Sequence, residues 1–441
     1  MISISEFSFD NPRFRALLEK SRETPVEVLR TVQEILDQVR SRGDEALFEY
    51  MKRFDRAELS RDTVRVADEE YDEAALRIPE PFAEALKQAC DNLFKFHQHQ
   101  LPKSYSVAYD HEVKLQRLYQ PIERVGVCVP GGAAPLASSL YMNLVPALVA
   151  GVPEITIISP PREGRVNDHI LYVADYLGIR NVYRVSGAQG VAALAYGTDS
   201  IARVDKIVGP GNVYTQTAKR LLYGTVGIDS LAGPSEVAIV ADADAPAAYV
   251  AADLLAQAEH GSGMETAVAF CTSFEQAEAI SSELVRLIRR HDLGNAVSTA
   301  LLGYGNIFVV DSLSAAVDAI NLIAPEHVEL MCEDAEDLIP MLRSSGAVFV
   351  GTHSTEAVGD YFCGTNHILP TGGTARFSSG LSVTDFLRGF SVVRYTPEAL
   401  AAHGPAIRAL ADAEGLTAHA LAVSIRKPPE PKRALKKNRE A

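Results

Sequence analysis

A series of short apolar runs, which begins near residue 125, constrains the fold more than any other feature of the sequence. Gly, Pro or Asp bounds each run, and segments with helical character lie between the runs. Short apolar runs that alternate with helices are typical of buried parallel strands in βαβ units. The runs fall into two successive sets: Val125–Val129, Ile155–Ser159, Val182–Val185 and Lys206–Val208, then Val237–Val240, Ala267–Phe270, Ile307–Val310 and Val348–Val350.

Two successive sets of this kind predict an α/β protein with two doubly wound, Rossmann-like domains and mostly parallel sheets. We expect a helical N-terminal region over residues 1–115 that packs on the second α/β domain. The first α/β domain is expected over residues 116–234 and the second over residues 235–380. After Gly380 no further strand is expected, and residues 381–441 should form a small helical appendix with helices over Pro397–Leu410 and Thr417–Ile425.

The N-terminal region carries helix signals. Thr24 to Glu27 reads as an N-cap, a Pro at the first helical position and a capping-box Glu. Gly43 is expected to end this helix, and Asp44 can cap the next one. The apolar face would be formed by residues spaced three and four apart: Val28, Val32, Ile35 and Val39.

Composition excludes several classes of protein. The 42 basic and 57 acidic residues give a formal charge of −15, which argues against nucleic acid as a partner. The basic run from Lys427 to Arg439 reads as a solvated terminus. Met1–Asp10 has no signal-peptide pattern, and Leu144–Pro160 is too short and too interrupted to span a membrane. Five scattered cysteines without a C-x-x-C pair argue against disulfides and a cysteine zinc site. We therefore expect a reduced, cytoplasmic protein.

Gly-rich turns follow several predicted strands, and ligands of doubly wound sheets bind at strand ends. Such turns let a backbone approach a phosphate closely. None of them fits G-x-G-x-x-G with an acidic residue about 20 positions further on, so simple turn chemistry at βα junctions is an equally open explanation. The turns are Val129–Gly132, Ser186–Gly190, Gly209–Asn212 and Ala232–Ser235.

Four of the eleven histidines lie near acidic or amide side chains. Imidazole with carboxylate suits both Zn²⁺ binding and general acid–base chemistry. No H-E-x-x-H motif occurs, so the zincin pattern is absent. Each pair also has a structural explanation as a surface pair, a cap or turn residues, and the other seven histidines, His97 among them, are taken as structural or surface residues. The pairs are Gln257 with His260, Glu326 with His327, Asp360 with His367, and Glu414 with His419.

Gln257 and His260 are three residues apart and share one face of a helix. Glu414 and His419 are five residues apart, which is roughly 140° around an ideal helix. They would share a face only if the chain breaks at Gly415.

Taken together, these segments resemble histidinol dehydrogenase from about residue 25 to residue 426. The number of ordered matches makes this resemblance more specific than any single motif. The matching stretches are Val129–Gly132, Ser186–Thr198, Asp205–Asn212, Ala232–Glu236, Gln257–His260, Ala324–His327, Gly359–Thr371, Arg376–Phe386 and Glu414–His419.

The resemblance implies a zinc-containing, NAD-dependent dehydrogenase that oxidises L-histidinol through histidinal to L-histidine in histidine biosynthesis. The family's zinc ligands map to Gln257, His260, Asp360 and His419, with zinc orienting the substrate. The acid–base pair maps to Glu326 and His327: His327 would take the alcohol proton, and Glu326 would activate water.

Further contacts follow from the same resemblance. Substrate contacts map to Ser235, Glu414 and His367, beside the zinc ligands and His327. NAD contacts map to Gln189 and Asn212 in residues 116–234. The family also implies a homodimer in which the appendix completes the partner's site, so that Glu414 and His419 come from the neighbouring subunit.

Three positions depart from the family pattern. At position 128 the family commonly has a Tyr that touches NAD. This chain has Cys128 there, so the expected NAD contact falls on a cysteine. The turn after His260 reads Gly261–Gly263, and a common Pro before Asp360 is Thr355. Two alternatives stay open: a paralogue that oxidises another polar alcohol, such as a sulfonated or diol substrate, and a zinc hydrolase or non-catalytic scaffold.

Overall fold

The computed structural model of the chain describes residues 2–20, 24–131 and 135–426. Gly132, at the end of one predicted turn, and the basic run from Lys427 lie outside these residues. The described residues divide into two compact units. The first comprises those of Met1–Leu101 and Pro121–Phe386, and the second those of Pro102–Gln120 and Leu387–Ala441.

The first unit contains two sheets, and the smaller one has five parallel strands in the order β6-β5-β4-β7-β8. Four of its strands coincide with the first set of predicted runs. The two-residue β8 was not predicted. The strands are β4 (Arg124–Cys128), β5 (Glu154–Ile158), β6 (Val182–Tyr183), β7 (Lys206–Val208) and β8 (Gly227–Ile228).

The larger sheet has six parallel strands in the order β1-β11-β10-β9-β12-β13. The second set of predicted runs forms four of them. β1 and β12 were not predicted as strands. The strands are β1 (Ser3–Glu6), β9 (Glu236–Ala241), β10 (Thr266–Cys271), β11 (Gly305–Val309), β12 (His327–Met331) and β13 (Ala347–Val350).

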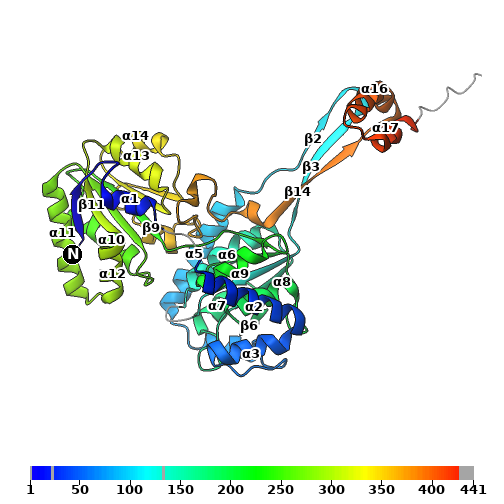
Figure 1. Cartoon of the computed structure of the whole chain (residues 1–441). Helices are drawn as coiled ribbons and strands as arrows, with labels where there is room; N and C mark the ends of the chain where they lie inside the picture. The colour runs from blue at the N-terminus through cyan, green and yellow to red at the C-terminus, as the bar shows by residue number, and fades with distance from the viewer. Residues whose placement is uncertain (1, 21–23, 132–134, 427–441) are drawn as a thin grey trace, which may run out of the picture. The chain divides into compact units, whose positions relative to one another are not determined.

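Helices cover both faces of the larger sheet (Figure 1). Along β9, Val237 and Ile239 belong to a core with residues of α10 and α11, whereas Ala238 and Val240 belong to a core with residues of α1 and α13. This burial on both faces explains why the strands read as apolar runs, and the predicted doubly wound α/β class is confirmed. The helices are α1 (Pro12–Leu18), α10 (Ala247–Ala258), α11 (Phe274–His291), α12 (Asn295–Tyr304), α13 (Leu313–Ile323) and α14 (Ala335–Leu338).

The helices α2–α5 pack on the helices of the smaller sheet. α2 contacts α8 and α9, α3 contacts α8, α4 contacts α7, and α5 contacts α6. The expectation that this region packs on the second α/β domain is therefore wrong for α2–α5, and only β1 and α1 join the larger sheet. The helices are α2 (Val26–Arg42), α3 (Asp44–Asp55), α4 (Asp68–Ala75), α5 (Glu80–Gln98), α6 (Ala137–Ala150), α7 (Asp168–Tyr176), α8 (Gly187–Tyr196) and α9 (Val213–Leu222).

The apolar face predicted for α2 explains this packing, because its buried members share a core with residues of α8. Gly43 ends the helix as expected, with φ of 58°. The predicted caps are wrong: α2 has no side-chain cap, and the Asp44 carboxylate instead accepts a hydrogen bond from the Ser200 hydroxyl at 2.7 Å.

The second unit holds a small sheet and the two predicted C-terminal helices. β2 (Tyr105–Ala108) and β3 (Lys114–Pro121) pair antiparallel, and β14 (Leu387–Arg394) joins β3. The expectation of no strand after Gly380 is therefore wrong, because β14 is half-exposed and carries no apolar run. α16 (Pro397–Ala413) and α17 (Thr417–Ser424) follow it.

Short helical segments complete the described elements: η1 (Asp110–Glu112), η2 (Ile339–Met341), α15 (Glu356–Tyr361), η3 (Thr374–Arg376) and η4 (Val383–Phe386). No described helix has the length and apolar character needed to cross a bilayer.

Candidate metal and acid–base site

The candidate site lies at the amino ends of central strands in the larger sheet. Glu236 is the first residue of β9 and His327 the first of β12, and the register places His327 beside Val237 and Ala347. Ligands of open α/β sheets more often bind at the carboxyl ends of strands. The site is therefore at the opposite edge from the one that the fold class favours.

The end of α10 brings two predicted ligands to this edge. Gln257, in the last turn, is fully buried. The amide orientation that satisfies its hydrogen bonds turns the N–H groups toward Glu356 Oε2 at 3.2 Å and the Glu236 carbonyl at 3.3 Å. His260 follows the helix and is exposed, with Nδ1 3.1 Å from the Ser235 hydroxyl oxygen.

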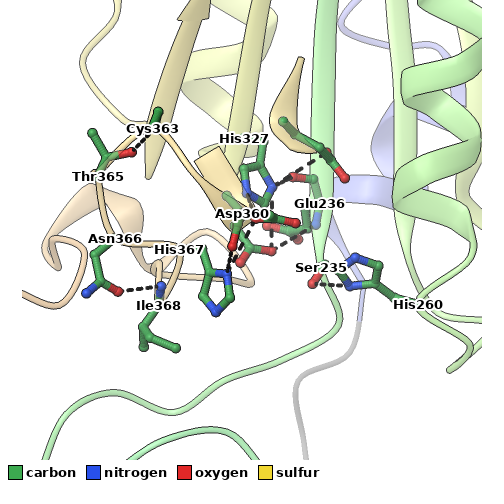
Figure 2. Close-up of polar contacts among 12 residues, drawn as sticks. Ser235, Glu236, His260, His327, Asp360, Cys363, Thr365, Asn366, His367 and Ile368 are labelled. Atoms are coloured by element: carbon green, nitrogen blue, oxygen red, sulfur yellow. Dashed lines mark hydrogen bonds and ion pairs between the residues drawn. The ribbon is translucent and has the colours of Figure 1, made fainter. Parts of the chain in front are cut away.

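The short helix α15 supplies Asp360. Its carboxylate lies 3.8 Å from His327 Nε2 and 3.8 Å from His367 Nδ1, so the two imidazoles flank it (Figure 2). One donor atom each of His260, Glu356 and Asp360 lies within 4.8 Å of the others. The structure thus brings three predicted ligands, Gln257, His260 and Asp360, to one place.

This group of side chains fits a zinc ion. Imidazole nitrogen and carboxylate oxygen are ordinary zinc ligands. The buried Gln257 amide, which is hydrogen-bonded to Glu356 through its nitrogen, has an oxygen left as a further neutral ligand. The ligand roles themselves stay predictions.

Glu326 and His327 enter the site at the start of β12. Glu326 Oε2 accepts a hydrogen bond from the Glu236 backbone N–H at 3.3 Å, and His327 Nδ1 lies 3.3 Å from the Glu236 carbonyl oxygen. His327 is buried, and its Nε2 has no hydrogen-bond partner among the described residues. Because a buried polar atom without a partner is costly, the geometry leaves Nε2 available for a bound group.

A glycine sets the position of Glu326. A Cβ atom on Gly346, just before β13, would lie 2.5 Å from the Glu326 carbonyl oxygen. The Gly346 and Ala347 backbone N–H groups donate to the carbonyls of Pro325 and Glu326. Gly346 therefore lets the two strands approach closely at the site.

Burial shifts the pKa values of the acid–base pair in opposite directions. It raises the pKa of Glu326 well above its usual value, and the nearby carboxylates of Glu236 and Asp360 add to this rise. It lowers the pKa of His327 to about 3 and raises that of Asp360 to about 6. A neutral His327 is therefore the stable form at pH 7. A bound dication would favour the ionised form of any carboxylate that it touches.

The predicted substrate residues of the first unit also lie here. Besides its contact with His260, Ser235 donates a hydrogen bond to Glu326. His367 Nδ1 lies 2.8 Å from the Asp360 carbonyl oxygen and Nε2 lies 3.4 Å from the Ser139 hydroxyl oxygen. Burial lowers the pKa of His367 to about 4, so this imidazole is also neutral at pH 7.

Sequence reasoning missed several carboxyl groups of the site. Glu356 begins α15 and is buried, and its backbone N–H donates to Glu329 Oε1 at 2.8 Å. Burial and the neighbouring Asp253 raise the pKa of Glu329 to about 9. One available signal was the spacing of Glu356 and Asp360, because residues four apart share a helix face. Glu236, at the start of β9, had no comparable signal.

The predicted NAD residues lie around the smaller sheet. Gln189 is buried in α8, and its Nε2 is 3.4 Å from Asp55 Oδ2. Asn212 is exposed and caps α9 through hydrogen bonds from two backbone N–H groups. The side chain of Cys128 belongs to the core, and burial raises the pKa of its thiol to about 12. Cys128 could therefore meet a dinucleotide mainly through its backbone.

Glu414 and His419 belong to the second unit, and both are exposed. Glu414 ends α16, and Gly415 adopts φ of 72° before α17 begins at Thr417. The break that the spacing of Glu414 and His419 required is therefore present. Their roles at the site stay predictions.

Comparison with known proteins identifies the family. The family model described as histidinol dehydrogenase matches residues 18–427. The chain belongs to the histidinol dehydrogenase family. It is 42% identical to the histidinol dehydrogenase of Geobacter metallireducens over 96% of this chain and 97% of that protein. With the enzyme from Agrobacterium fabrum it shares 44% identity over 95% and 96%.

A solved histidinol dehydrogenase has the same fold. The crystal structure from Elizabethkingia anophelis matches with a TM-score of 0.89 and 34% identity, covering 96% of this chain and 98% of that one. The protein is therefore an oxidoreductase of the histidinol dehydrogenase family that acts on a small molecule.

Proposed function

We propose that this protein is a zinc-containing histidinol dehydrogenase that uses NAD to oxidise L-histidinol, through histidinal, to L-histidine in histidine biosynthesis. The observation that carries the proposal is the convergence of Gln257, His260 and Asp360 beside a buried His327 whose Nε2 has no hydrogen-bond partner among the described residues. Membership in the family supports L-histidinol as the substrate, since the relatives that match most of the chain are named for histidinol.

Gln257, His260, Asp360 and His419 would hold the zinc ion. When bound, zinc would supply a fixed positive charge that orients the imidazole and amino nitrogens of the substrate. Ser235, His367 and Glu414 would supply further polar contacts, which a substrate with a charged amine and an imidazole requires.

His327 would act as the general base. Its imidazole is neutral at pH 7 because burial lowers its pKa, and Nε2 has no hydrogen-bond partner among the described residues. This nitrogen would accept the proton of the substrate hydroxyl while NAD, the co-substrate, receives the hydride. A neutral imidazole at hydrogen-bond distance is suited to this transfer.

Glu326 would prepare the second oxidation. Its raised pKa makes its carboxylate a stronger base than an exposed glutamate. It would take a proton from water as the oxygen adds to the aldehyde carbon, while protonated His327 returns its proton to the aldehyde oxygen. The hydrate then loses a second hydride to another NAD, and one of its two hydroxyl protons goes to the neutral His327. One alcohol and one water thus yield one acid and two NADH.

The proposal includes a homodimer in the cytoplasm. Gln189 and Asn212, with the backbone near Cys128, would contact NAD. Glu414 and His419 would complete the site of the neighbouring subunit.

The test is the yield of NADH from purified, zinc-loaded protein with limiting L-histidinol. Two NADH per substrate are expected, and the yield should fall after chelation and return with added zinc. No NADH formation with L-histidinol would refute the proposal.

The Cys128 and Thr355 departures motivate a second candidate, a paralogue that oxidises another polar alcohol. A panel of polar alcohols under the same conditions tests it. A single NADH per molecule of another alcohol, with none from L-histidinol, would favour the paralogue.

A further inference from the structure

The two ends of the Gln257 amide differ chemically, and only one can bind a metal. The oxygen Oε1 has lone pairs, whereas the NH₂ group can only donate hydrogen bonds. Gln257 therefore contributes to the site only when Oε1 faces the ion. Because its side chain is fully buried, protein groups rather than solvent decide which way the amide points.

Two acceptors fix this orientation. The Glu356 carboxylate lies 3.2 Å and the Glu236 carbonyl 3.3 Å from the Gln257 amide nitrogen. A backbone carbonyl only accepts hydrogen bonds, and so does the Glu356 carboxylate in its ionised form, so together they hold the NH₂ group on their side and leave Oε1 on the other.

Glu356 is itself held in place by neighbouring elements. Its backbone N–H donates to Glu329 Oε1 of β12 at 2.8 Å. The preceding Thr355 hydroxyl donates to Asp253 Oδ1 at 2.8 Å. Asp253 and Gln257 are four residues apart on α10 and share one helix face, so α15 is hydrogen-bonded to β12 and to the face of α10 that carries Gln257. A Pro at position 355, which the family resemblance would lead one to expect, has no hydroxyl and could not make this bond.

We propose that Glu356 is a positioning residue whose carboxylate orients the Gln257 amide so that its oxygen faces the zinc ion. The inference rests on the proposed zinc site and adds a role to a residue outside the ligand set. Removing a residue that orients a metal ligand typically weakens metal affinity by roughly 10–100-fold.

The test is zinc affinity, measured by competition with a chromophoric chelator on the full-length protein. Glu356→Met removes the acceptor at similar volume and should weaken zinc binding about 10–100-fold. Glu356→Gln keeps an acceptor oxygen and should change affinity by less than about threefold. Equal affinity in the wild type and Glu356→Met would overturn the inference.

A second background separates orientation from direct ligation by Glu356. In Gln257→Glu, the ligand has two equivalent oxygens and needs no orientation. Adding Glu356→Met should then leave zinc affinity unchanged or raise it, because a like charge is removed. A loss as large as in the wild-type background would overturn the inference and make Glu356 a ligand. The absorption of Co²⁺-substituted protein gives an independent readout of the ligand set.

Two further comparisons keep the result interpretable. Circular dichroism shows whether Glu356→Met folds. If it does not, Glu356→Gln replaces it in the Gln257→Glu background, where zinc affinity should rise relative to Gln257→Glu alone. A fall in zinc affinity would contradict the inference. Gln257→Ala tests the zinc site itself. If Gln257→Ala binds zinc as tightly as the wild type, the proposed ligand set is wrong. If Gln257→Ala binds zinc weakly while Glu356→Met keeps the wild-type affinity, only the role of Glu356 is overturned.

Discussion

At the scale of single residues, the proposed role of His327 depends on keeping its imidazole uncharged. The imidazole is buried, and burial outweighs the favourable carbonyl of Glu236, so its pKa falls to about 3. Protonated His260 and His367 would lower it further. Three carboxyl groups lie within 4 Å of the ring, those of Glu326, Glu356 and Asp360. The pKa values of these carboxyl groups are themselves raised, which favours their neutral forms. A neutral carboxyl group, or a carboxylate bound to a cation, does little to stabilise a protonated His327.

This arrangement predicts the effect of His327→Asn. The variant keeps a polar side chain of similar size but loses the base, so kcat should fall about 10²–10⁴-fold. Zinc content, measured by atomic emission, should stay at the wild-type level because His327 is outside the proposed ligand set. His291→Asn, an exposed change at the end of α11, is the matched control and should leave kcat unchanged. Retained turnover in His327→Asn would contradict the base assignment.

At the scale of elements, the spacing of β12 and β13 fixes the backbone of Glu326. Gly346→Ala would place a methyl group 2.5 Å from the Glu326 carbonyl oxygen, so the backbone must shift. We expect a loss of about 1–3 kcal/mol in the free energy of unfolding, measured with urea, and a lower kcat. Gly294→Ala is the control, since nothing lies within 4 Å of its added methyl group. A Gly346→Ala enzyme as stable as Gly294→Ala would refute the close approach.

The packing of α5 predicts a pH-dependent stability. His97 is fully buried and its Nε2 lies 3.2 Å from the Asn366 amide, in the loop after α15. Burial lowers its pKa from 6.5 to about 4. Between these values the unfolded chain binds a proton that the folded chain does not, so stability falls as pH falls. From pH 7.5 to pH 5 the loss is about 2 kcal/mol.

The variant His97→Gln lacks this proton and isolates the effect. The difference in free energy of unfolding between the wild type and the variant should shift by about 2 kcal/mol against the wild type from pH 7.5 to pH 5. Urea unfolding followed by circular dichroism at both pH values measures it. A difference that stays constant with pH would show that His97 is protonated in the folded protein.

The burial of the side chains along a strand determines whether that strand could be predicted from the sequence. β9 and β10 are buried at every position and read directly from the sequence as apolar runs. β12 is equally buried, but His327 and Glu329 interrupt its apolar pattern. β14 alternates between half-buried and exposed positions, so its composition resembles that of a loop.

The site was predictable where chemistry clusters along the chain. Gln257 with His260 and Glu326 with His327 are neighbours in sequence, and the resemblance implied roles for them that stay predictions. Glu356 was missed because an acidic residue in the first turn of a helix is usually a solvated partner of the helix dipole. Its burial depends on contacts with β12 and α10, which no local pattern encodes.

At the scale of the whole molecule, the proposed site needs residues from both units. Glu326 and His327 lie in the first unit, whereas Glu414 and His419 lie in the second. The proposed homodimer draws the second pair from the neighbouring subunit. The sequence alone could not decide between one chain and two, because it records the order of residues but not which copy supplies each.

Subunit complementation tests this arrangement. His327→Asn and His419→Asn should each be inactive alone, the second because it loses a zinc ligand. In a mixed dimer with shared sites, one site carries both changes and the other carries neither. Random mixing makes half of the dimers mixed, so activity should return to about one quarter of the wild-type value after co-refolding.

The control pairs two changes from the same unit. His327→Asn mixed with His260→Asn should stay inactive, because every shared site then receives one damaged first unit. If both residues of each site came from one chain, neither mixture would recover activity. Activity that returns only when His327→Asn is mixed with His419→Asn therefore requires that His419 act in the partner's site. If neither mixture recovers activity, His419 acts in the site of its own chain.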